Sequence, residues 1–231
     1  MFTDRPLQSS RLAVYGGGPL VARLLVGLGA GHVVEWTRRI AGSDAVVLER
    51  AGSRWRLAEL GQAVLGADVL ILGQGPARRE AAPPALQEAL RRRPTLVISL
   101  VQGASVAALR RWLGCAVPMV RAVPEPTARS FEGGCSVFAT PDVHATQRRL
   151  AEQLLDAVGW PLMVPFEELL EPVAALTGCE GGCAFLLPRV LAQLSLGLSP
   201  VRKEARLRAM FPGGTLGLVE ASAEETLRLS A

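Results

Sequence analysis

The stretch Arg11–Leu28, RLAVYGGGPLVARLLVGL, decides the fold. It opens with a short apolar run, continues with three glycines, and ends with leucines that recur at helical spacing. A strand, a tight glycine turn and a helix in this order are typical of domains that bind a dinucleotide. We expect Gly16 to allow the sharp turn, and Gly18 to let the backbone approach a pyrophosphate at the positive end of the helix.

Apolar strands and amphipathic helices alternate through the following residues. The pattern predicts strands at His32–Trp36, Ala45–Glu49, Ala67–Leu72, Thr95–Leu100, Cys135–Ala139 and Trp160–Val164. It predicts helices at Leu57–Leu65, Pro84–Arg92, Val106–Leu113 and Thr146–Val158. This alternation indicates an α/β fold with a doubly wound parallel sheet. We assign residues 1–165 to this nucleotide-binding domain and the helical remainder, residues 166–231, to a second, smaller domain.

Composition excludes several classes of protein. The chain of 231 residues is 49% hydrophobic and 20% charged, as expected of a globular protein rather than a disordered one. Its net charge of +4 comes from dispersed arginines, without the basic and aromatic clusters of nucleic-acid-binding proteins. No apolar run is long enough to span a bilayer, and the polar start MFTDRPLQSSR does not resemble a signal peptide. We therefore expect a cytoplasmic protein with reduced cysteines, and no metal site, membrane or nucleic acid.

The residues expected to hold the cofactor fall into two groups. The pyrophosphate would lie on the glycine turn and the helix start, at Gly16, Gly17, Gly18, Pro19 and Leu20. Thr37, Arg38 and Arg39, directly after the predicted second strand, suit a ribose 2′-phosphate and favour NADP. Glu35 suits a free 2′-hydroxyl, so NAD stays open. In another register the second strand is Val46–Arg50, and Arg50 becomes the phosphate ligand.

Short motifs in a fixed order run through the rest of the chain. These are GQGP at Gly73–Pro76, SLVQGAS at Ser99–Ser105, RWLG at Arg111–Gly114, RAVP at Arg121–Pro124, a helical run at Glu168–Leu176 and PGGT at Pro212–Thr215. Together with the glycine turn, they resemble the pyrroline-5-carboxylate reductase family from Leu12 to about Glu220. The resemblance implies a Rossmann-like domain and a small all-helical dimerisation domain. It also implies a homodimer that reduces a cyclic imino acid, pyrroline-5-carboxylate, to proline with a nicotinamide cofactor.

The resemblance assigns further residues to the cofactor. Gly73, Gln74, Gly75 and Pro76 correspond to the family's A-V-K-P loop beneath the nicotinamide, with Gln74 in place of the lysine. Glu125 stands where the family has an asparagine near the nicotinamide. A carboxylate only accepts hydrogen bonds, whereas a protonated Glu125 can act as an acid. An exposed glutamate without a catalytic part is the other interpretation of Glu125.

The resemblance also assigns the substrate pocket. The run Thr177-Gly178-Cys179-Glu180 replaces the family's S-G-S-G, and Gly213-Gly214-Thr215 belongs to the loop that binds the substrate carboxylate and ring nitrogen. Gly178, Cys179, Gly213 and Gly214 are therefore expected to contact the substrate. The candidates for a hydrogen-bond donor to the imine nitrogen are Thr215, Thr177 and a protonated Glu180.

Two further functions stay open beside the NAD(P)H-dependent reductase of a cyclic imine. A non-catalytic relative that binds a nucleotide or a protein partner would explain the altered pocket positions and the short helical region before Pro212. A dehydrogenase acting on another substrate, such as a 3-hydroxy acid, would be expected to keep a lysine or histidine as acid and base. No histidine stands at a suitable place for that role.

Overall fold

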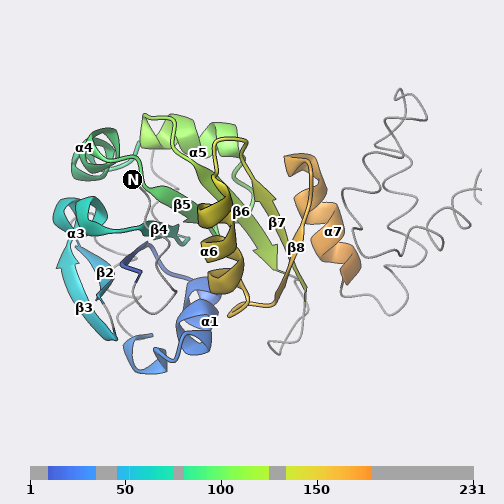
Figure 1. The fold of residues 1–231 in the computed structure, drawn as a ribbon, viewed down its shortest axis with the longest axis horizontal. Coiled ribbons are helices and arrows are strands. Elements are labelled where there is room, and N and C mark those ends of the chain that lie inside the picture. Colours follow the sequence, from blue (N-terminus) through green and yellow to red (C-terminus); the bar gives the residue numbers. More distant parts are fainter. Residues whose placement is uncertain (1–9, 35–45, 52, 75–80, 125–133, 178–231) are drawn as a thin grey trace, which may run out of the picture.

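The computed structural model describes residues 10–34, 46–51, 53–74, 81–124 and 134–177 as one mixed sheet with helices on both faces (Figure 1). The strands are β1 (Leu12–Tyr15), β2 (Val46–Ala51), β3 (Arg54–Glu59), β4 (Val69–Leu72), β5 (Leu96–Ser99), β6 (Met119–Pro124), β7 (Gly134–Ala139) and β8 (Trp160–Met163). The helices are α1 (Pro19–Gly27), α3 (Leu60–Gly66), α4 (Pro84–Arg92), α5 (Val106–Leu113), α6 (Ala145–Leu155) and α7 (Leu170–Thr177), with short 3₁₀ turns η2 (Gly31–Val33) and η4 (Glu167–Leu169).

The two faces of the sheet are covered by different helices. Successive side chains of a strand point to opposite faces. In β1, Leu12 and Val14 therefore pack with α1 and α6, whereas Ala13 and Tyr15 pack with α3, α4 and α5. All four residues are fully buried. A fold with helices on both faces of a largely parallel sheet is the expected α/β fold.

The strand order is β3-β2-β1-β4-β5-β6-β7-β8. Its first six strands follow the usual Rossmann order, in which the sequence of strands across the sheet reverses between β1 and β4. Strands β1, β4, β5 and β6 are parallel, so their carboxyl ends share one edge. This confirms the Rossmann-like α/β class. The sheet is nevertheless mixed rather than wholly parallel, because β2 pairs antiparallel with β1, β3 with β2, and β7 with β6.

The strand predicted at His32–Trp36 is wrong over the residues that the structure describes. Helix α1 ends in a Schellman arrangement, in which the Ala30 amide donates to the Leu25 carbonyl at 2.7 Å and the Gly29 amide donates to Val26. Gly29 supplies the positive φ of 72° that this ending requires. The chain then continues as η2, with Val33 buried. The second strand is instead β2, which overlaps the predicted Ala45–Glu49.

The helix predicted at Leu57–Leu65 is correct only from Leu60 onward. Residues up to Glu59 extend β3, and Glu59 pairs with Val46 at the end of the β2–β3 hairpin. The Glu59 carboxylate then caps α3, accepting hydrogen bonds from the amides of Gly61 at 2.9 Å and Gln62 at 3.0 Å. A carboxylate at a helix start satisfies free amides and complements the helix dipole. The same residue therefore ends the strand and begins the helix.

Helix α7 packs against the strands β6 and β7, beyond the end of the main helical layers (Figure 1). Leu170 and Val173 are buried there beside Val123 and Val164. The Ser136 hydroxyl on β7 donates to the Leu170 carbonyl at 2.6 Å. The boundary predicted at residue 165 stays a prediction, because the described chain ends at Thr177. Among the described residues, no helix is long and apolar enough to cross a membrane.

Candidate functional site

The glycine turn lies at the carboxyl end of β1, beside the point where the strand order changes direction. Gly16 has a φ of 92° and Gly18 a φ of 104°, both in the region that only glycine adopts without strain. Between them, the Gly17 amide donates to the Gln74 carbonyl at 3.0 Å, and the Gln74 amide donates to Gly17 at 2.8 Å. The turn is thus fastened to the residues that follow β4.

Gly73 allows the two segments to approach this closely. A Cβ atom on Gly73 would lie 2.6 Å from the Gly17 carbonyl oxygen and 2.6 Å from a methyl group of Val21. Only a residue without a side chain fits at that distance. The predicted cofactor residues Gly73 and Gln74 therefore lie against the glycine turn.

Among the described residues, the start of α1 offers hydrogen-bond donors without an acceptor. Pro19 occupies the first helical position, where its missing N–H costs nothing, and no side chain caps the helix. The Ala22 amide donates to Gly18, but the amides of Leu20 and Val21 have no partner in the described part of the chain. Free amides at a positive helix end, next to a side-chain-free turn, fit a phosphate group. The residues present therefore fit the pyrophosphate of a dinucleotide.

A cavity of about 200 Å³ opens at the same edge of the sheet, at the carboxyl ends of β5 and β6. It is lined by Gln102, Gly103, Val123, Glu171 and Ala174. The side chain of Gln102 also accepts a hydrogen bond from Gln74 Nε2 at 3.1 Å. One contact therefore joins the loop beside the glycine turn to the cavity.

A buried arginine holds α7 next to this cavity. Arg121 on β6 is 4% exposed. Its guanidinium donates to Glu167 Oε1 at 2.7 Å and to Glu171 Oε1 at 2.8 Å. Glu167 Oε1 also accepts from the Val106 amide at 2.6 Å, at the first residue of α5. The network joins β6, α5 and the segment formed by η4 and α7 beside the cavity. It contains two carboxylates and one cation.

The end of β2 lies far from the glycine turn, because β2 runs antiparallel to β1. Arg50 pairs in register with Leu12, the first residue of β1, whereas the glycine turn follows Tyr15. Arg50 is buried, donates to the Ser10 carbonyl at 3.1 Å, and lies 5.9 Å from the centre of the Trp55 ring. The interpretation of Arg50 as the phosphate ligand is therefore wrong.

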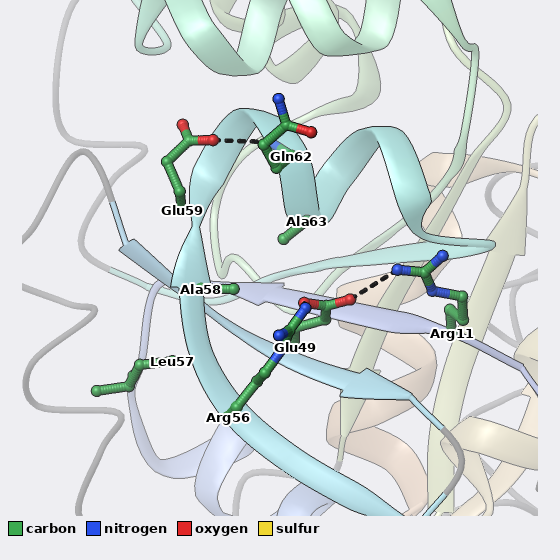
Figure 2. A pocket seen from close by; sticks show the side chains of 8 residues that line it. All are labelled: Arg11, Glu49, Arg56, Leu57, Ala58, Glu59, Gln62 and Ala63. Atoms are coloured by element: carbon green, nitrogen blue, oxygen red, sulfur yellow. Dashed lines mark hydrogen bonds and ion pairs between the residues drawn. The ribbon is translucent and has the colours of Figure 1, made fainter.

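A second, polar pocket of about 290 Å³ lies between the β2–β3 hairpin and α3 (Figure 2). Glu49 points into it and accepts hydrogen bonds from Arg11 at 2.9 Å and from Arg56 at 3.0 and 2.8 Å. Burial raises the pKa of Glu49, but the hydrogen bonds and charges of the two arginines outweigh it, so the pKa is lowered overall. The carboxylate of Glu49 thus joins Arg56 on β3 to Arg11, the residue before β1, and fastens the hairpin to the start of β1.

The structure brings together only part of the predicted site. Gly16, Gly17, Gly18, Pro19, Leu20, Gly73 and Gln74 lie within one turn-and-loop unit. Thr177 is the last residue of α7. Outside the described residues are Glu35, Thr37, Arg38, Arg39, Gly75, Pro76, Glu125, Gly178, Cys179, Glu180, Gly213, Gly214 and Thr215.

Four residues of this edge were not predicted as site residues: Gln102, Arg121, Glu167 and Glu171. The sequence carried one signal for Gln102, which stands where the motif S-x-x-A-G-x-S has alanine. Glu167 and Glu171 are spaced to lie on one side of a helix, but only the fold shows that this side meets β6.

Comparison with known proteins gives the same family as the motifs. No protein-family model matches the chain. The chain is 32% identical over 206 residues to a pyrroline-5-carboxylate reductase of Pseudomonas aeruginosa (strain PAO1), covering 84% of this chain and 72% of that protein. It is 28% identical over 211 residues to one of Mycobacterium tuberculosis, covering 85% of this chain and 68% of the relative.

Solved structures agree on the fold. A pyrroline-5-carboxylate reductase of Coxiella burnetii superposes with a TM-score of 0.56 at 24% identity, covering 96% of this chain and 85% of that one. The pyrroline carboxylate reductase of Plasmodium falciparum, solved with NADP bound, gives a TM-score of 0.54 at 17% identity, over 93% and 80% of the two chains. The identity to the Pseudomonas enzyme, the extent of the match and the glycine turn at the strand crossover lead to one conclusion: the chain belongs to the pyrroline-5-carboxylate reductase family.

Proposed function

We propose that the protein is an NAD(P)H-dependent oxidoreductase that reduces the C=N bond of a cyclic imine, with pyrroline-5-carboxylate as the first substrate to test. The single observation that carries the proposal is the glycine turn of Gly16–Gly18 before α1, with free helix-start amides on one side and Gly73 pressed against it on the other. Relatives named pyrroline-5-carboxylate reductase support the reaction.

The described residues supply binding and positioning. The amides of Leu20 and Val21 and the N-terminal dipole of α1 would hold the pyrophosphate. A reduced nicotinamide, when bound, supplies the hydride. The cavity beside Gln102 and Val123 would then hold the reacting groups near one another and away from bulk water. Holding donor and acceptor in contact is a large part of catalysis in such a reaction.

The proton for the imine nitrogen requires a separate donor. We propose Thr215, Thr177 or a protonated Glu180 for this role, with Gly178, Cys179, Gly213 and Gly214 in contact with the substrate. Glu125 is the remaining proposed contact near the nicotinamide. All of these assignments come from motif correspondence. Single substitutions test them: a substitution that lowers kcat while the cofactor affinity is unchanged identifies a residue that acts in the chemical step.

We propose NADP as the cofactor, with NAD as the alternative. Thr37, Arg38 and Arg39 offer a hydroxyl and two cations for a 2′-phosphate, and one structurally similar reductase was solved with NADP. Replacing both arginines with alanine should raise the Kd for NADPH more than that for NADH. We also propose a homodimer, because the family resemblance implies a dimerisation domain; mass measurement in solution tests it. We further propose that the protein acts in the cytoplasm and takes part in proline biosynthesis, as the family resemblance implies.

The test of the activity is direct. Purified protein mixed with NADPH and pyrroline-5-carboxylate should consume the reduced nicotinamide absorbance in proportion to the amount of protein. Proline should accumulate in equal amount. Saturable NADPH binding without turnover on several cyclic imines would contradict the enzyme proposal.

That result would favour a second function, a non-catalytic protein that binds nucleotide. The observation behind it is the loss of charge at Gln74, where the family motif has a lysine beneath the nicotinamide. A protein that keeps the nucleotide-binding turn but has lost the polar groups of the substrate pocket would bind the cofactor without reducing an imine. Absence of any nucleotide binding would exclude both functions.

A further inference from the structure

Two departures from the family motifs contact one another. Gln74 replaces the lysine of A-V-K-P, and Gln102 replaces the alanine of S-x-x-A-G-x-S. The structure joins them: Gln74 Nε2 donates to Gln102 Oε1 at 3.1 Å. The two residues follow β4 and β5, which are neighbours in the sheet and end at the same edge. Two altered positions far apart in the sequence thus form one polar feature.

The pair reaches from the glycine turn to the cavity. At one end, the backbone of Gln74 is bonded to Gly17 in both directions. A Cβ atom on Gly18 would lie 3.4 Å from Gln74 Cβ and 3.7 Å from Gln74 Oε1. At the other end, Gln102 lines the cavity of about 200 Å³. The reactive ring of a dinucleotide lies beyond its pyrophosphate, so a dinucleotide seated on the turn would pass this pair before its ring enters the cavity.

The hydrogen bond between the two side chains does not involve the oxygen of Gln74 or the NH₂ group of Gln102. Gln74 Oε1 and Gln102 Nε2 have no partner in the described part of the chain. An oxygen that accepts and an NH₂ group that donates complement a primary carboxamide, which carries one group of each kind itself. A lysine at position 74 would offer donors only, and an alanine at position 102 would offer nothing. The chemistry of this pair therefore differs from that of the family motifs.

We propose that Gln74 and Gln102 form a recognition pair for the carboxamide of the nicotinamide ring and so position the ring in the cavity. The inference rests on the proposed binding of a nicotinamide cofactor. Gln102 Nε2 donates to the carboxamide oxygen, and Gln74 Oε1 accepts from its NH₂ group. A carboxylate in place of the carboxamide has no proton to donate and places its charge against Gln74 Oε1.

The experiment compares two ligands that differ only at this group, namely oxidised NADP and its nicotinic acid analogue. Their dissociation constants are measured by calorimetry on the full chain, so that the readout is binding and not turnover. The wild-type protein should bind NADP at least about tenfold more tightly than the nicotinic acid analogue. The analogue loses one hydrogen bond, and its negative charge faces the partial negative charge of Gln74 Oε1. Gln102→Ala should lower this ratio to about threefold or less.

Gln74→Lys gives a result of opposite sign. The lysine places a cation where the acceptor stood, so the nicotinic acid analogue should bind at least as tightly as NADP itself. Both substitutions restore the residue of the family motif, Gln102 is exposed and Gln74 is half-buried, so each variant is expected to fold. Gln153→Ala, an exposed residue on α6, is the matched control and should keep the wild-type ratio.

The outcomes separate the two proposals. If the wild type binds NADP and all three variants keep its ratio of affinities, the recognition pair is overturned while the cofactor proposal stands. If the wild type binds neither ligand, the proposed function fails and the inference fails with it. A lowered ratio in Gln102→Ala together with a reversed ratio in Gln74→Lys supports the pair, since a purely structural role would weaken both ligands equally.

Discussion

Gly73 lies against Gly17 at a distance that leaves no space for a side chain: a Cβ atom on Gly73 would come within 2.6 Å of the Gly17 carbonyl oxygen. The loop after β4 and the turn after β1 are therefore a single unit. Its shape sets the position of the proposed phosphate site, since the same turn leads directly into α1.

The substitution Gly73→Ala should distort this unit. The contacting atom is backbone, which cannot move aside as a flexible side chain would, so we expect a loss of about 1–3 kcal/mol in the free energy of unfolding. The Kd for NADPH should also rise. Urea unfolding and fluorescence titration measure the two effects. Gly31→Ala should leave binding unchanged, because among the described residues an added Cβ atom would meet only Val26, at 3.8 Å. Equal affinities in Gly73→Ala and wild type would contradict the close approach.

The substitution Gly18→Asp should abolish binding of the dinucleotide. It adds a side chain at a φ of 104° and a negative charge next to the proposed phosphate site. Gly29→Asp is the matched control: Gly29 also has a positive φ of 72°, but it lies at the far end of α1 and no described atom is within 4 Å of an added Cβ. It should cost stability and keep affinity. Calorimetric titration with NADPH distinguishes the two; binding retained in Gly18→Asp would place the phosphates elsewhere.

Replacing Arg121 with methionine should destabilise the fold strongly. The change leaves Glu167 and Glu171, 21% and 51% exposed, without their cation, and the loss of hydrogen bonds between charged groups costs about 1.5–3 kcal/mol. Arg92→Met breaks only an exposed pair with Glu88 within α4, so it should cost about 0.5 kcal/mol or less. Urea unfolding of both variants gives the comparison. A variant Arg121→Met as stable as Arg92→Met would show that the network contributes little.

Acid should destabilise the protein partly through Glu49. The arginines lower the pKa of Glu49 in the folded state, so the unfolded chain takes up a proton first as the pH falls. Its contribution to stability is complete above the pKa of the unfolded state and is lost as the pH falls through the folded pKa. Glu49→Gln should therefore flatten the acid side of a plot of unfolding free energy against pH. Identical curves for Glu49→Gln and wild type would contradict the assignment.

The elements that the sequence predicted best carry strong local signals. Helices α4 and α5 have the predicted bounds, Pro84–Arg92 and Val106–Leu113. The first has proline at its start, and the second is capped by the Ser105 hydroxyl, which accepts from the Ala108 amide at 3.2 Å. Such start signals act within one turn and are readable without the fold.

The β2–β3 hairpin could not be predicted in the same way. The residues LAELGQAVL at 57–65 fit helical spacing, but pairing with β2 extends the strand to Glu59 before the helix begins. Likewise, the glycine turn was predicted from its own residues, whereas the contact between Gln74 and Gln102 depends on β4 and β5 lying side by side. Features made by tertiary pairing leave little trace in one sequence.

The reversed direction of β2 has a practical consequence for changing coenzyme preference. In most Rossmann proteins, that preference is altered by exchanging an acidic residue for arginine where the second strand ends. Here β2 ends at the opposite edge of the sheet, where Glu49 accepts a hydrogen bond from Arg11 and Arg50 donates one to the Ser10 carbonyl. Engineering at those two positions would loosen the hairpin and leave the choice between the two nicotinamide coenzymes as it was.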